Sequence, residues 1–189
     1  MINKIVFVDS SIYFGMIIWE DENLILAKNF SDDLDLDGYS CINKSKIKII
    51  NSKGKKARFY QKLCELRSES LPSNVDFVFG SMAELLSSLK STVAIDYIDE
   101  GGRSIFFVGL IERIGKKHIG GRYISPLGVV DESRLDKIYY NKIIKVQIGG
   151  RYLKAFDLYT GRCGATGPSC FTFPEAAPLS FMPRLSDQR

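Results

Sequence analysis

A tetrapeptide that occurs twice constrains the fold of this chain more than any other feature of its sequence. Residues 11–14 read SIYF and residues 104–107 read SIFF, an offset of 93 positions. The same offset places Phe30 on Tyr123. Internal similarity of this kind is typical of a duplicated structural unit. We therefore expect two related units, one in each half of the chain.

The apolar segments of the sequence predict β-strands. They are rich in Ile, Val, Phe and Tyr, and turn-forming residues separate them. The predicted strands cover residues 4–8, 12–19, 24–28, 44–50, 93–98, 104–114, 122–130 and 143–148. The stretch YIDEGGRSIFF predicts a hairpin at Gly101 and Gly102. The pentapeptide IGGRY, at 119–123 and again at 148–152, predicts in both places a glycine turn before a strand or helix.

One helix is predicted between the two halves, over residues 82–90. Ser81 and Glu84 have the spacing of a capping box. The apolar residues that follow fall on one helical face; they are Met82, Leu85, Leu86 and Leu89. We expect this helix to pack across both halves, and a second helix is predicted over residues 58–67.

These elements predict an α+β fold that is mainly antiparallel β. We expect two related small barrels or curved sheets joined by a short amphipathic helix. The predicted parts are a first β-rich unit (1–70), a connecting helix segment (71–92), a second β-rich unit (93–160) and a Pro/Gly-rich tail (161–189). The tail contains no Lys, Ile, Asn or Tyr. This shift in composition indicates loop structure and a separate gene history, as in accessory genes of variable loci.

Composition excludes several classes of protein. The chain has 189 residues, of which 45% are hydrophobic, which is enough for a folded core. No apolar run approaches the roughly 18 residues of a membrane span, and the first residues do not resemble a signal peptide. We therefore expect a cytoplasmic protein without a membrane partner. The four cysteines have no zinc or redox spacing, although a bridge between Cys163 and Cys170 is left open.

The sequence contains no pattern that indicates catalysis. The single histidine, His118, lies beside Lys116 and Lys117 and has no acid nearby in the sequence that could orient its ring. The glycine-rich IGGR stretches lack the spacing of phosphate-binding loops. We therefore predict that the protein is not an enzyme and has neither a metal nor a cofactor.

The stretch DDLDLDGY, residues 32–39, has an aspartate at every second position. Asp33, Asp35, Asp37 and Gly38 match the opening of a calcium-binding loop. The match fails at the twelfth position, where a bidentate glutamate is required and Lys44 is present. An extended segment with its leucines inside and its aspartates outside, ending in a turn at Gly38, fits the alternation better.

Charge is distributed unevenly along the chain. Residues 1–40 contain two lysines and eight acidic residues, whereas the whole chain has a net charge of +4. An acidic surface can occupy a basic active site in place of a phosphate backbone, and charge complementarity speeds association. We therefore predict a protein-binding inhibitor of the immunity type that neutralises a toxin with a basic active site. Its predicted contact residues are Glu20, Asp21, Glu22, Asp32, Asp33, Asp35 and Asp37.

RNA binding is the alternative prediction. In KSKIKII the lysines alternate with Ser45, Ile47 and Ile49, so a strand here would present a basic face to the solvent. Phe59 and Tyr60 could stack on bases. The predicted RNA-binding residues are Lys44, Lys46, Lys48, Lys53, Lys55, Lys56, Arg58 and Arg151.

Two motifs carry a resemblance to a known family. The D-G-Y turn in the first half and IIKVQIGGRYL in the second half resemble the Sm-like small β-barrels, over residues 12–50 and 104–153. The second Sm motif has an apolar strand, a glycine turn beside a basic residue and another strand. The resemblance implies RNA binding, with Gly149, Gly150 and Arg151 as the matching turn.

Overall fold

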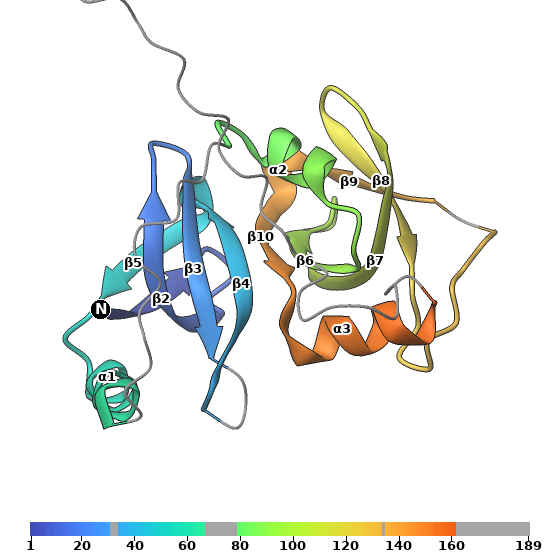
Figure 1. The fold of residues 1–189 in the computed structure, drawn as a ribbon. Helices are drawn as coiled ribbons and strands as arrows, with labels where there is room; N and C mark the ends of the chain where they lie inside the picture. The colour runs from blue at the N-terminus through green and yellow to red at the C-terminus, as the bar shows by residue number, and fades with distance from the viewer. Residues whose placement is uncertain (31–33, 67–78, 134, 162–189) are drawn as a thin grey trace, which may run out of the picture.

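The computed structural model describes residues 1–30, 34–66, 79–133 and 135–161. Ten strands form one antiparallel sheet in the order β5-β1-β2-β3-β4-β10-β6-β7-β8-β9 (Figure 1). The strands are β1 (Ile2–Phe7), β2 (Ile12–Glu20), β3 (Leu24–Phe30), β4 (Leu36–Asn43), β5 (Ile47–Asn51), β6 (Val93–Ile98), β7 (Ser104–Ile114), β8 (His118–Tyr123), β9 (Asp136–Tyr139) and β10 (Ile143–Ile148).

Helices and short turns complete the described structure. They are α1 (Lys55–Leu66), α2 (Met82–Ser88), α3 (Gly150–Tyr159) and the 3₁₀ turns η1 (Lys44–Lys46) and η2 (Tyr140–Lys142). The predicted α+β class, dominated by antiparallel strands, is therefore confirmed. The ten strands of the described residues do not close into a barrel. Within the described residues, no helix has both the length and the apolar character required to cross a membrane.

The two halves of the sheet have the same strand order. The last strand of each half lies beside the first, so that β5 pairs with β1 and β10 pairs with β6. In each half a 3₁₀ turn precedes the last strand and an α-helix follows it. The first residue of each 3₁₀ turn also makes a similar hydrogen bond: Lys44 N donates to Asn23 O, and Tyr140 N donates to Lys117 O.

When the strand pairs of the two halves are compared, each residue of β2 corresponds to the residue of β7 that lies 94 positions later. This offset is one residue larger than the 93 positions that separate the two tetrapeptides. Gly15 and Gly109 occupy the same place in their hairpins, shortly before a β-bulge. The ring of Tyr13 lies over Gly15, and the ring of Phe107 lies over Gly109. Phe107 is buried, whereas Phe106, which the tetrapeptide match aligns with Tyr13, is 51% exposed.

The helix that follows the last strand of each half packs on its own half of the sheet. Tyr60 of α1 is buried in one cluster with Met16 of β2. Phe156 of α3 is buried in another cluster with Leu110 of β7. The two clusters occupy equivalent places, because Met16 and Leu110 are also 94 positions apart.

Helix α2 packs against both halves, as expected from the sequence. Its predicted cap is present, because the Ser81 hydroxyl accepts a hydrogen bond from Glu84 N at 3.2 Å. Leu85 of α2 is buried in a cluster that includes Leu26 of β3 and Phe107 of β7. The helix ends at Ser88, two residues earlier than the predicted 82–90 segment.

The structure corrects the prediction for residues 44–50. Residues Lys44–Lys46 form a 3₁₀ turn, and the strand begins only at Ile47. The side chain of Asn43 stabilises this turn by accepting a hydrogen bond from Ser45 N at 3.1 Å. The three lysines of KSKIKII therefore do not share one strand face.

The structure also corrects the predicted Gly38 turn. Gly38 lies inside β4, a strand that was not predicted. It has a φ of +69°, and a Cβ here would lie 2.8 Å from Ile148 O and 2.9 Å from Gly150 N. The glycine therefore permits a close approach between β4 and the beginning of α3 rather than a turn.

The pentapeptide IGGRY has two different structures. At 119–123 it belongs to strand β8, so the predicted glycine turn and the strand over 122–130 are wrong. A Cβ on Gly121 would lie 2.7 Å from Phe107 Cζ, so a larger residue here would displace this buried ring. At 148–152 the same letters do form a turn, and there the positive φ angles of Gly149 and Gly150 lead from β10 into α3.

Candidate functional site

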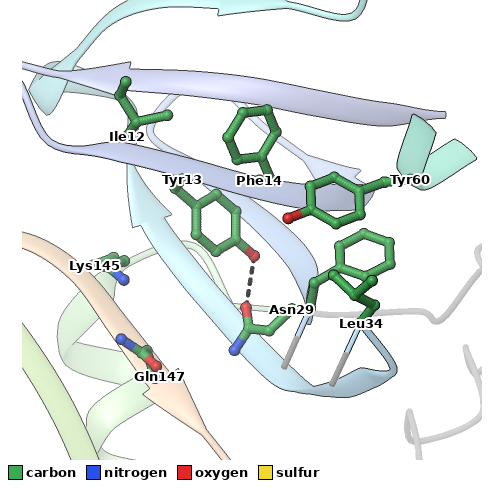
Figure 2. A pocket seen from close by; sticks show the side chains of 9 residues that line it. Ile12, Tyr13, Phe14, Asn29, Leu34, Tyr60, Lys145 and Gln147 are labelled. Carbon is green, nitrogen blue, oxygen red and sulfur yellow. Dashed lines mark hydrogen bonds between the residues drawn. The ribbon is translucent and has the colours of Figure 1, made fainter. Parts of the chain in front are cut away.

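A pocket of about 340 Å³ opens between β2, β3, α1 and β10 (Figure 2). Its volume is in the range of small-molecule sites, ~300–1,000 Å³. Residues from both halves of the chain line it: Ile12, Tyr13, Phe14, Asn29, Phe30, Leu34, Tyr60, Lys145 and Gln147. One wall is aromatic and the other is polar.

Three rings form the aromatic wall. Phe30 and Tyr60 are stacked, with ring centroids 4.7 Å apart and planes 18° apart. Phe14 contacts the same tyrosine ring at 5.5 Å, with the planes tilted by 59°. The Lys56 ammonium lies 4.8 Å from the Phe14 centroid and 5.7 Å from the Tyr60 centroid. Flat apolar surfaces and a positive charge therefore meet at this side of the pocket.

Hydrogen bonds hold the polar wall together. The Tyr13 hydroxyl donates to Asn29 Oδ1 at 2.6 Å, as Figure 2 shows. Burial raises the pKa of Tyr13, so this phenol remains protonated and a donor throughout the physiological pH range. Lys145 Nζ lies 5.3 Å from the Tyr13 ring centroid and 3.1 Å from Asp96 Oδ2. Gln147 Nε2 donates to the same carboxylate at 3.4 Å.

The second half has a packed core where the first half has this aromatic wall. Val108 and Ile124 occupy the positions of Phe14 and Phe30, and both are buried together with Phe156 of α3. Phe14 and Phe30 are only partly buried. Phe14 and Phe30 are therefore less completely buried than their counterparts in the second half.

The first part of the predicted acidic surface lies at the β2–β3 turn. Lys44 Nζ is 3.4 Å from Glu20 Oε2 and donates to Asp21 O at 2.6 Å. The Asp21 carboxylate accepts a hydrogen bond from Leu24 N at 2.6 Å. Glu22 is exposed at the same turn. One of the predicted RNA-binding lysines is thus paired with the Glu20 carboxylate and hydrogen-bonded to the backbone of Asp21.

The second part of the acidic surface lies at the opposite end of β3. The Asp37 carboxylate accepts hydrogen bonds from Arg151 N at 2.9 and 3.0 Å. Arg151 Nη2 also lies 3.8 Å from Asp35 Oδ2. Asp32 and Asp33 lie outside the described residues. The described acidic residues therefore do not form one patch, and Arg151 is paired with two of them.

An Asp37→Ala substitution should lower the free energy of unfolding by about 1 kcal/mol, as for the loss of a helix cap. Asp37 caps α3 from outside the helix, and the N-cap residue itself is Gly149, which has no side chain. Urea unfolding measures the effect. The control is Asp35→Ala, because the Asp35 and Arg151 side chains are 50% and 58% exposed and such pairs contribute little. Equal losses in both variants would contradict a capping role.

The predicted RNA-binding lysines follow the chain from η1 into α1. Lys44 and Lys46 lie in η1. Lys48 lies on β5, Lys53 follows that strand, and Lys55, Lys56 and Arg58 lie on the first turn of α1. Of these, Lys56 reaches the aromatic wall of the pocket. Arg151 belongs to α3 instead.

Sequence reasoning found only one of the residues that line the pocket. Tyr60 was a predicted stacking residue, whereas its neighbour Phe59 is 55% exposed and does not line the pocket. Tyr13 and Phe14 lie in a predicted strand, and Lys145 and Gln147 alternate on another. The alternation of polar residues along 143–148 is the signal that could have indicated a polar surface there.

The described cysteines are structural in character. Cys41 and Cys64 are both buried. Burial raises the pKa of Cys41 to about 12. Cys163 and Cys170 lie outside the described residues, as does most of the predicted tail. Within the described part of the chain, no three His, Cys, Asp or Glu side chains are grouped so that they could hold a metal ion.

Comparison with known protein families, curated protein sequences and solved structures finds no match to this chain.

Proposed function

We propose that this protein binds single-stranded RNA and that one base enters the pocket and contacts its aromatic wall. The observation that supports this function best is the contact of Lys56 with the rings of Phe14 and Tyr60. Proteins that bind single strands combine aromatic stacking surfaces with basic residues that follow the phosphate backbone. Lys53, Lys55 and Lys56, which run from the end of β5 into the first turn of α1, would supply such a basic path.

The polar wall would read the edge of the base. Asn29 and Gln147 both carry amides, which can donate and accept hydrogen bonds. Lys145 shares its charge with Asp96 at 3.1 Å, so it is positioned for a directed hydrogen bond more than for general attraction of phosphate. Stacking provides the affinity, and these groups provide a preference among bases.

The inhibitor hypothesis has weaker support. Its described acidic residues are divided between the two ends of β3, and Glu20, Asp35 and Asp37 lie next to Lys44 or Arg151. An RNA-binding surface needs none of these acidic residues, because it uses other elements. We therefore prefer RNA binding to toxin inhibition.

We also propose that the two halves arose by duplication of one small β unit of the Sm-like type. The shared strand order and the offset of 94 residues between their second strands support this origin. One difference from the resemblance concerns the glycine turn: Gly149 and Gly150 lead into a helix rather than into another strand. The RNA contacts are accordingly proposed at the pocket and not at that turn.

A Phe30→Leu substitution should weaken binding of a single-stranded RNA oligonucleotide about tenfold, since stacking contributes roughly 1–3 kcal/mol per base. Leucine keeps most of the apolar volume but removes the ring face. Fluorescence anisotropy with labelled RNA homopolymers of ten nucleotides measures the affinity. The matched control is Phe59→Leu, which removes an exposed ring outside the pocket and should leave the affinity unchanged.

Substitution of lysines distinguishes contacts with the phosphate backbone of the RNA from contacts with a base in the pocket. Lys56→Gln should weaken binding to all four homopolymers alike and lower the slope of log affinity against log salt by about one. Lys62→Gln serves as the control because Lys62 pairs with Glu65 on the same helix. An RNA affinity that does not depend on salt concentration, or an equal loss of affinity in Phe30→Leu and Phe59→Leu, would contradict RNA binding at this site. If this protein instead captures a single partner protein after nuclease treatment, and the Glu22→Lys variant does not, the inhibitor hypothesis would be supported.

A further inference from the structure

A second pocket, of about 320 Å³, lies in the second half of the chain between α3 and the loop that joins β8 to β9. Figure 1 shows this loop beside the C-terminal end of α3. The helix contributes the rings of Tyr152, Phe156 and Tyr159, and the loop contributes Pro126 and Leu127. Among the described residues, none lines both pockets, so the occupant of this second pocket does not depend on the proposed RNA site.

Hydrogen bonds and packing define the loop wall of this second pocket. Ser125 N donates a hydrogen bond to Val129 O at 2.9 Å, and Gly128 N donates to Ser125 O at 2.9 Å. Gly128 has a φ of +79°, and a Cβ here would lie 2.5 Å from Tyr159 Cδ1. The loop therefore packs directly on α3, and the pocket is preformed, as binding pockets usually are.

The surface around the second pocket is apolar and open to solvent. Large apolar residues gathered at one place on a protein surface indicate a site that another segment binds. Five such residues come from the two elements that form this pocket, with exposed fractions of 81% for Leu127, 61% for Val129, 53% for Tyr152, 66% for Leu158 and 71% for Tyr159. We therefore expect an apolar segment to bind here.

The chain leaves the described structure beside this same pocket. Helix α3 ends in a left-handed cap, because Gly161 has a φ of +69° and its N donates a hydrogen bond to Leu158 O at 3.2 Å. Gly161 follows the pocket residue Tyr159 by two positions and precedes residues 162–189, which lie outside the described residues. Those residues therefore begin at the edge of the pocket.

Residues 162–189 contain an apolar segment whose chemistry fits the second pocket. The stretch FTFP has two phenylalanines at alternate positions, Phe171 and Phe173, followed by Pro174. Alternate side chains of an extended segment point to the same side. Extended segments with proline bind in grooves lined by aromatic residues, because they lose little conformational entropy. We propose that this FTFP segment binds in the pocket between α3 and the loop of the same molecule.

The connection between α3 and the FTFP segment is long enough for this contact. Nine residues, 162–170, separate Gly161 from Phe171 and can span roughly 30 Å. Helix α3 has 10 residues and is therefore about 15 Å long. A short connection also gives the segment an effective concentration in the millimolar range, which favours binding within one molecule over binding to a second copy.

The native Cys170, directly before the FTFP segment, allows a test in the full chain. In a Cys163→Ser background, Leu127→Cys should form a disulfide with Cys170 on mild oxidation, detected by mass spectrometry of the non-reduced monomer. The control is Leu66→Cys on α1, at a position that is 71% exposed, and its disulfide should form about tenfold more slowly. The other cysteines are buried and do not compete. Equal rates in the two variants, or disulfide-linked dimers in place of the monomer, would overturn the proposal.

Proteolysis of the full chain tests the same contact without a crosslink. Chymotrypsin cleaves after phenylalanine, so Phe171 reports on the proposed segment and Phe181 on the chain beyond it. Leu127→Asp places a charge in the pocket at an 81% exposed position, where the fold should not change, as circular dichroism confirms. Cleavage after Phe171 should become about tenfold faster, because proteolysis follows the population of the unbound segment, and cleavage after Phe181 should stay the same. If Leu127→Asp leaves both rates unchanged, or raises both alike, the FTFP segment does not bind in this pocket.

Discussion

An Asp157→Ala variant is expected to lose about 3 kcal/mol of its free energy of unfolding, measured by urea denaturation. The Asp157 carboxylate is 5% exposed and accepts hydrogen bonds from Thr92 N at 2.8 Å and from Thr92 Oγ1 at 2.6 Å. Thr92 is itself fully buried. Alanine leaves both donors without an acceptor, and each buried unsatisfied group costs about 1–3 kcal/mol.

The control for this prediction is Thr92→Val, which removes the hydroxyl but keeps the backbone hydrogen bond. It should cost about 1 kcal/mol, the value of a single hydrogen bond. The hydrogen bonds from Asp157 join α3 to the residue that precedes β6, so Asp157→Ala should also increase amide hydrogen exchange along α3. An Asp157→Ala variant as stable as the wild type would show that another group or water replaces the carboxylate.

The second large effect is expected for Gly109→Ala, with a loss of about 3 kcal/mol, at the upper end for an overpacked core. A Cβ at Gly109 would collide with Arg122 O and lie 2.5 Å from Phe107 Cζ. Arg122 O belongs to the paired strand β8, so it cannot move without disturbing the hydrogen bonds between β7 and β8. Thermal unfolding and urea denaturation both measure the loss.

Gly15→Ala is the matched control, since Gly15 occupies the same place in the first half. There the nearest atoms to a Cβ all belong to the Tyr13 side chain, including Cε1 at 2.5 Å, and a ring can turn aside. The expected cost is about 1 kcal/mol, together with loss of the hydrogen bond from Tyr13 to Asn29. Equal destabilisation by the two substitutions would contradict the distinction between backbone and side-chain clashes.

Several elements could be predicted from the sequence with the correct bounds. The strands over 93–98, 104–114 and 143–148 coincide with β6, β7 and β10. They lie in the middle of the sheet and are rich in the β-branched and aromatic residues that favour strands. The beginning of α2 was also predictable, because its cap is a local signal.

Elements defined by distant partners could not be predicted. Strand β4 contains Asp37 and Gly38, which suggest a turn when only neighbouring residues are considered. The role of Gly38 depends on Ile148 and Gly150, which lie more than a hundred residues away in the sequence. The first IGGRY is likewise a strand because it pairs with β7 on one side and β9 on the other.

The candidate site shows the same limitation. Lys145 and Gln147 come next to Tyr13 and Asn29 only because β10 is inserted beside β4. The predicted acidic surface shows the reverse case. Its residues are close together in the sequence, but β3 lies between the two groups, so they are found at opposite ends of that strand. Charge counted along a chain therefore did not locate a surface, whereas strand order did.

The position of β10 has a consequence for synthesis of the protein. Asn43, at the end of β4, donates a hydrogen bond to Ile143 O, a residue 100 positions later in the chain. At translation rates of about 5–20 residues per second, the edge of β4 remains uncovered on the ribosome for roughly 5–20 s. Neighbouring nascent chains on one messenger RNA can exchange β10 during this interval. Slow translation of the second half should therefore favour intertwined dimers over correctly folded monomers.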